Sequence, residues 1–187
     1  MVALQDLWLP ILLSGVAVFL ASSILHMVLP LHRSDYGRIE GEDAVLDALR
    51  ASGIGPGHYM FPHCTSMQDY ASEEHKAKLA QGPSGFMTVL SGPVNMGKQL
   101  GIWFLHTLVV GVFCAYITGL SVGEGAGFGD VMRRAGAVAF AAYGLGAVPE
   151  SIWKGLRWGI TAKFLFDGLV YALVTGAVFA AAWPAAV

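Results

Sequence analysis

Four long stretches of the chain are apolar, and each is long enough to form a membrane-spanning helix. They cover approximately residues 7–29, 99–120, 131–148 and 161–183. The first stretch covers roughly 30 Å of hydrocarbon at about 1.5 Å per residue, which is the thickness of a bilayer core. The pattern therefore predicts an all-α membrane protein, a bundle of four transmembrane helices that forms a single membrane domain over residues 1–187.

The residues that flank the first and third stretches indicate what kind of segment each one forms. No Lys or Arg precedes Leu7, and the first run is longer than the apolar core of a signal peptide, so we expect a retained helix. The third run is shorter and built largely of Ala and Gly. Pro149 disfavours helical geometry at the preceding residue, which predicts that the third helix ends at Val148.

About 65 mostly polar residues separate the first and second helices. Glu42–Arg50 has its apolar residues on one face, which predicts a short amphipathic helix. Thr65 and Gln68 have the spacing of a capping box, which predicts a second helix over residues 70–80. Phe86–Leu90 is apolar and fits a strand or a segment on the bilayer surface. We therefore expect a partly helical loop.

Composition agrees with a membrane setting. Charged residues make up 13% of the chain, about half the usual share of a soluble domain. The net charge of −2 gives no general attraction to nucleic acid. Cys64 and Cys114 fall in different regions and do not suggest a disulfide framework. No cofactor is expected.

Basic residues indicate the orientation. Nine of the eleven Lys and Arg residues lie on one side, either between Leu31 and Lys98 or between Pro149 and Lys163. The positive-inside rule then places the loop, about residues 30–95, in the cytoplasm and both termini outside.

Small residues recur at four-residue spacing in the second and fourth helices. Such stripes allow helix backbones to approach closely. They indicate tight packing within the bundle, and the same stripes can also mediate self-association. The residues are Gly111, Ala115 and Gly119 in the second helix, and Gly168, Ala172, Gly176 and Ala180 in the fourth.

Four ionisable residues are expected at a similar depth near the inner ends of the helices. They are Asp167, Lys163, His26 and His106. Intramembrane ionisable groups often mark ion or proton pathways, which is one interpretation. The other is structural: Lys163 pairs with Asp167 four residues later, and the histidines donate to backbone carbonyls.

The loop holds a second candidate cluster formed by His58, His63, Cys64 and Met67. Imidazole and soft sulfur ligands suit copper. The alternative is a packed aromatic–proline turn with a buried free thiol. Cys64 beside a histidine also has the composition of a nucleophilic dyad, but no GxSxG, HExxH or P-loop pattern accompanies it.

Three segments, Leu31–Tyr36, Gly85–Leu90 and Phe166–Gly176, resemble those of a group of uncharacterised bacterial four-helix inner-membrane proteins. The resemblance covers most of the chain. It implies a bacterial inner-membrane setting and assigns no site residue.

The sequence thus favours a non-enzymatic accessory or scaffold protein of a membrane assembly. Its expected partners are the lipid bilayer and other membrane subunits or further copies of itself. One alternative is a small ion- or proton-coupled transporter or channel that uses Asp167, His26 and His106. Another is a copper-handling or electron-transfer protein that uses the cluster from His58 to Met67.

Overall fold

The structure is a computed structural model that describes residues 1–186, and most of these residues are helical. Contacts divide the chain into two compact units. Residues 1–36 and the residues from Asn95 onward form one, the helix unit, and Gly37–Val94 form the other, the loop unit. The sequence-based assignment of one membrane domain stays a prediction.

The helix unit contains four helices that are long and apolar enough to cross a membrane, as the sequence predicted. They cover Leu4–Val28, Met96–Ser121, Phe128–Lys154 and Trp158–Ala181. The first consists of a 3-10 turn, α1 (Trp8–Ser23) and a π-helical turn, η2 (Ile24–Val28). The second is α5 (Met96–Ser121) and the fourth is α8 (Trp158–Ala181). The third combines α6 (Phe128–Tyr143), η4 (Leu145–Ala147) and α7 (Val148–Lys154).

The third helix does not end at Val148, so that prediction is wrong. α6 ends at Tyr143, a 3-10 turn follows, and α7 begins at Val148. Pro149 then lies in the first turn of α7, where its missing N–H leaves no hydrogen bond unmade. The proline therefore starts a new helical segment instead of ending the old one.

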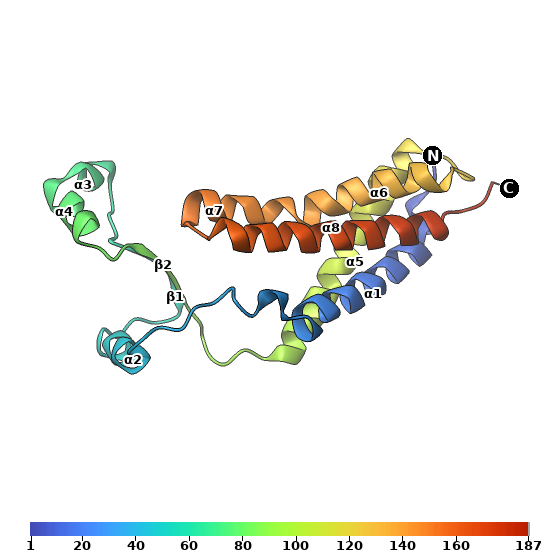
Figure 1. Cartoon of the computed structure of the whole chain (residues 1–187). Helices are drawn as coiled ribbons and strands as arrows, with labels where there is room; N and C mark the ends of the chain where they lie inside the picture. The colour runs from blue at the N-terminus through green and yellow to red at the C-terminus, as the bar shows by residue number, and fades with distance from the viewer. Residues whose placement is uncertain (187) are drawn as a thin grey trace. The chain divides into compact units, whose positions relative to one another are not determined.

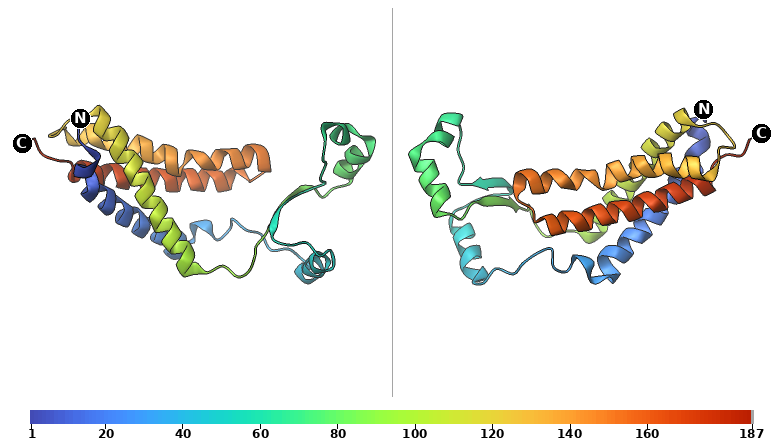
Figure 2. Two further views of the ribbon diagram at one scale, coloured as in Figure 1. Left: turned by 180° about the vertical axis from the view of Figure 1, so that it is seen from behind. Right: turned by 45° about the horizontal axis from the view of Figure 1, so that its top comes forward.

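Two pairs of helices build the unit (Figures 1 and 2): α6 runs beside α8, and α1 runs beside α5 and also contacts α8. Both ends of the described chain lie at the end of the bundle where α5 meets α6. The N–H of Val2 donates to the carbonyl of Gly119, and the N–H of Gly125 donates to the carbonyl of Pro184.

The small-residue stripes pack inside this one chain. An added Cβ at Gly168 would lie 2.5 Å from the Cα of Gly144, and one at Gly176 would lie 2.6 Å from the Met132 carbonyl oxygen. A Cβ at Gly119 would lie 2.8 Å from the carbonyl oxygen of Val2. Close backbone approach thus holds α8 against α6 and the N-terminal segment against α5.

The loop unit holds three helices and a two-stranded antiparallel sheet. The helices are α2 (Glu42–Ala51), α3 (Met67–Ala71) and α4 (Glu73–Gln81), and the strands are β1 (Gly57–Phe61) and β2 (Gly85–Val89). In the sheet, Gly57 faces Val89 and Phe61 faces Gly85. The apolar segment after Gly85 is therefore a strand, and β1 is an element that the sequence pattern did not predict.

The prediction of a capping box at Thr65 is also wrong. The hydroxyl of Ser66 accepts a hydrogen bond from the N–H of Asp69, so Ser66 caps α3. The Thr65 hydroxyl instead donates to the Asp69 carboxylate. Ser72 is extended and caps α4, which divides the expected helix into two.

Candidate metal centre

The end of α1 brings two histidines together. After Ser23 the helix widens into the π-helical turn η2, which carries His26, and π-helical turns are often found at functional sites. The chain then bends at Leu29 into a 3-10 turn, Pro30–His32. The rings of His26 and His32 stack with their centroids 4.1 Å apart and their planes 19° apart.

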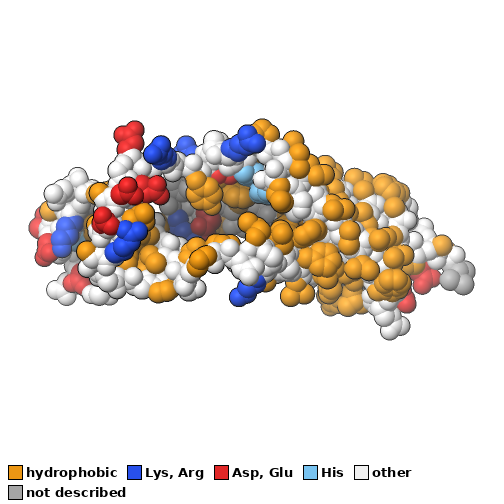
Figure 3. Space-filling view, turned by 90° about the horizontal axis from the view of Figure 1, so that it is seen from below, with side chains coloured by type: hydrophobic (Ala, Val, Ile, Leu, Met, Phe, Trp, Pro, Cys, Tyr) orange, Lys and Arg blue, Asp and Glu red, His pale blue; other side chains and the backbone are white. Residues whose placement is uncertain are grey.

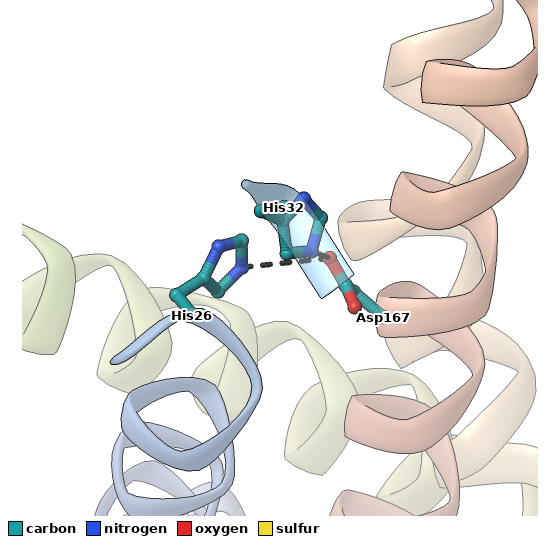
Figure 4. A group of neighbouring side chains, drawn as sticks. All are labelled: His26, His32 and Asp167. Carbon is teal, nitrogen blue, oxygen red and sulfur yellow. Dashed lines mark ion pairs between the residues drawn. The ribbon is translucent and has the colours of Figure 1, made fainter. Parts of the chain in front are cut away.

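Asp167 of α8 completes the cluster (Figure 4). Its carboxylate is buried, with 2% of the residue exposed. Asp167 Oδ2 lies 2.9 Å from Nε2 of His32 and 3.4 Å from Nε2 of His26. Neither carboxylate oxygen has a hydrogen-bond partner with suitable geometry among the described residues, and neither does Nε2 of His32. The carboxylate is therefore close to two imidazoles without hydrogen bonding to either.

A second set of contacts involves the other ring nitrogen of His32, Nδ1. Its Nδ1 lies 2.6 Å from Asp35 Oδ2, and Lys163 Nζ lies 2.6 Å from Asp35 Oδ1. Lys163 Nζ also donates to the Ser34 hydroxyl at 2.9 Å, and Arg157 donates to the Ser34 carbonyl. Burial raises the pKa of Asp35, but the hydrogen bonds from Lys163 and His32 outweigh it and hold the pKa below its ordinary value. Asp35 is thus a carboxylate that accepts hydrogen bonds.

The tautomer of His32 follows from its hydrogen bond with the ionised Asp35 carboxylate. Because ionised Asp35 only accepts, Nδ1 of His32 carries the proton. In a neutral His32, Nε2 then carries a lone pair, and it lies 2.9 Å from a second acceptor, Asp167 Oδ2. A cation bound by both atoms would stabilise two acceptors at this distance.

The geometry fits a metal ion. One ligand atom from each of His26, His32 and Asp167 can be chosen so that all three lie within 4.8 Å of one another. With metal–ligand bonds of roughly 2.0–2.1 Å, neighbouring ligand atoms lie about 3.0 Å apart at octahedral angles and about 3.4 Å apart at tetrahedral angles. The separations of 2.9 and 3.4 Å to Asp167 Oδ2 fall in the range that these two geometries span. Asp35 on Nδ1 of His32 supplies the outer carboxylate that usually orients a metal-binding histidine.

A cavity of about 500 Å³ adjoins this cluster. It is formed by the first, second, third and fourth helices, and both His26 and Asp167 lie in its wall. Most of its other lining residues are apolar or aromatic. They are Ser22, Ser23, Met27, Met96, Leu100, Trp103, Tyr143, Phe164 and Tyr171.

The structure rearranges the polar cluster that was expected from the sequence. Lys163 does not pair with Asp167, because its ammonium binds Asp35 instead. A base followed by an acid four residues later is the weaker order for a helical pair, and Asp35 reaches the ammonium directly. His106 also lies apart, with its ring beside Trp103 and Tyr143.

Sequence reasoning missed His32 and Asp35. Both lie in Leu31–Tyr36, a segment singled out only for its resemblance. The available signal was a second histidine six residues after His26, with Pro30 between them to turn the chain. A proline-centred bend is what allows two residues at that spacing to face the same point.

The loop cluster has a different arrangement. His58 lies in β1 and contacts the Thr88 hydroxyl, and Met67 is 82% exposed. His63 and Cys64 line a cavity of about 220 Å³ together with His75. Within residues 1–186, the metal-capable groups of three His, Cys, Asp or Glu side chains include none of these residues. Copper at this cluster stays a prediction.

The sequence matches no family model, and no curated protein or solved structure gives a match. Function is therefore inferred from the geometry of the helix unit.

Proposed function

We propose that this chain is a multi-pass protein of the bacterial inner membrane and that it binds one divalent transition-metal ion between His26, His32 and Asp167. The membrane setting is supported by what the four long helices present outward. Large apolar side chains cover most of their visible outer face (Figure 3). Exposed examples are Leu13 and Leu20 of α1, Leu105 and Phe113 of α5, and Leu169 and Leu173 of α8. Water would solvate such a surface poorly, whereas lipid matches it.

The metal proposal rests on one observation. Asp167 is a buried carboxylate with no hydrogen bond among the described residues, and two imidazole nitrogens face it. An isolated ionised carboxylate in a membrane helix is expensive, so it needs a compensating cation. A divalent ion within reach of all three ligand atoms would supply that cation and would use the Nε2 lone pair of His32.

The ligand set indicates the kind of metal. Two imidazoles and one carboxylate suit Fe²⁺, Zn²⁺ and related ions, and they lack the sulfur ligands that favour Cu⁺. Three protein ligands leave coordination positions open, as in catalytic sites and unlike closed structural sites. Since His26 and Asp167 line the cavity, the metal would be accessible to a small molecule there.

The small-residue stripes give the scaffold hypothesis less support than the sequence suggested. The glycines of the small-residue stripes already pack against Ile11, Val2, Gly144 and Met132 of the same chain, so they no longer argue for self-association. The scaffold role and the absence of enzymatic activity stay predictions.

A cation-coupled transporter is the second candidate. One observation favours it: contacts run without a break from Lys163 through Asp35 and His32 to Asp167 at the cavity. Flux of protons or divalent cations in proteoliposomes, compared between the wild type and a folded Asp167→Asn variant, tests this candidate. Wild-type flux that vanishes in the variant supports transport.

The proposed orientation keeps the loop unit in the cytoplasm and both termini outside. It is supported by the nine basic residues between α1 and the start of α5 and around the α7–α8 link, against two at the other end of the bundle. The location of both ends of the described chain at the α5–α6 end of the bundle agrees with termini on one side.

Cobalt titration tests the metal centre. Co²⁺ has visible absorption bands that report its ligands, so binding to detergent-purified, metal-free protein is directly observable. The wild type should bind one Co²⁺ per chain. His32→Ala and Asp167→Asn should each weaken binding at least tenfold, because each removes or weakens one of three ligands.

His106→Ala is the matched control, since it removes an imidazole from the same bundle but outside the cluster. Its affinity should equal that of the wild type. A wild type that binds no Co²⁺, or a His106 variant that loses as much affinity as the His32 variant, would disprove the metal centre.

A further inference from the structure

The cavity beside the metal centre has walls of two kinds. Met27, Met96, Leu100 and Phe164 make part of it apolar. On α8, Asp167 and Tyr171 lie one turn apart in the same wall. A molecule that fills this space must therefore be apolar along most of its length and polar where it meets α8.

Tyr171 indicates which polar group the bound molecule must carry where it meets α8. The residue is 4% exposed, and its hydroxyl has no hydrogen-bond partner within the described part of the chain. The residue lines the cavity, and a buried phenol without a partner favours a neighbouring group that accepts its hydrogen bond. An open coordination position on the metal likewise favours an oxygen with a free lone pair. Both requirements point to one oxygen-bearing head group.

The net charge of the metal centre indicates which kind of oxygen-bearing head group it would bind. The divalent ion carries +2 and Asp167 carries −1, while Asp35 and Lys163 neutralise each other at 2.6 Å. The centre is therefore left with a net positive charge of about one beside the largely buried His32 and Asp167, where an uncompensated charge is costly. A ligand with a single negative charge removes this cost, and a neutral ligand does not.

We propose that the cavity binds a single-chain carboxylate amphiphile, such as a fatty-acid anion. Its carboxylate ligates the metal and accepts the hydrogen bond of Tyr171, and its chain lies against the apolar wall. The volume of about 500 Å³ falls in the range of pockets that enclose one small molecule. The bilayer that surrounds the helices is also where such amphiphiles dissolve. This inference rests on the proposed metal centre.

The test uses the full chain, loaded with Co²⁺ in phosphatidylcholine nanodiscs and freed of unbound metal. Dodecanoate should shift the visible cobalt bands saturably, with one molecule bound per chain. Methyl dodecanoate has the same chain without the charge and should leave the bands unchanged. Acetate has the same head without the chain and should bind at least a hundredfold more weakly.

Two variants locate the binding. Tyr171→Phe should weaken dodecanoate binding about tenfold by removing a hydrogen bond to a charged acceptor. Leu100→Trp should abolish binding by filling the cavity. Both variants must still show the wild-type cobalt spectrum before dodecanoate is added, which establishes that the bundle is folded.

The outcomes separate the two proposals. Normal cobalt bands that dodecanoate does not change would overturn the carboxylate site and leave the metal centre standing. Equal binding of the methyl ester or of acetate would also overturn it, since charge or chain would then not be recognised. Absence of cobalt bands before any amphiphile is added would show that the metal centre itself has failed, and the carboxylate site with it.

Discussion

Gly176→Ala is the substitution for which the structure gives the sharpest expectation. A Cβ at this position would lie 2.6 Å from the carbonyl oxygen of Met132 and 3.3 Å from the backbone N of Gly136. Both atoms belong to the backbone of α6, so no side chain can rotate away. To restore a contact of 3.4 Å, α6 and α8 must separate locally by about 0.8 Å.

The magnitude follows from the rigidity of the contact. Overpacking a well-packed interior costs roughly 1–3 kcal/mol. Since the clash involves backbone and α8 packs along α6, we expect the upper part of this range, about 2–3 kcal/mol of unfolding free energy. Gly176 lies nine residues beyond Asp167 on α8. Metal affinity should therefore change little.

Gly159→Ala is the matched control on the same helix. Nothing lies within 4 Å of a Cβ at Gly159, so the added methyl meets open space. Alanine has the better helix propensity, and stability should stay the same or rise by up to about 1 kcal/mol. Equilibrium unfolding in mixed micelles with increasing dodecyl sulfate measures both variants. If the two variants unfold at the same dodecyl sulfate fraction, close backbone packing of α8 on α6 does not stabilise the bundle.

Three further predictions concern the site, the loop and the orientation. Asp35→Asn should weaken Co²⁺ binding by roughly 10–100-fold, because it removes the carboxylate that orients His32; an unchanged titration would contradict this role. Cys64→Ala should leave the metal content of the purified protein unchanged, as elemental analysis will show, whereas loss of one copper per chain would restore the loop cluster as the metal site. A reporter inserted at Gly82 should behave as cytoplasmic and one at the C-terminus as external, and the reverse pattern would refute the orientation.

In the loop unit, local sequence patterns determine less of the secondary structure than they do in the helix unit. Helix α2 has an acidic first turn and its apolar residues on one face, and it forms within one residue of the predicted bounds. Strand β1 gains its hydrogen bonds from β2, about 28 residues later in the chain. A pairing over that distance is a tertiary contact, so the sequence around Gly57 alone does not specify it.

The four long helices were determined by the sequence itself. An apolar run of about 20 residues satisfies its backbone within its own helix, so its formation depends little on its neighbours. Which polar residues meet was decided only by the tertiary structure. Lys163 and Asp167 are one turn apart on α8, yet Lys163 pairs with Asp35 and Asp167 lies beside His32, both on the segment that follows α1. An ion pair forms wherever opposite charges can approach most closely, and here the bend at Pro30 brings His32 and Asp35 to α8.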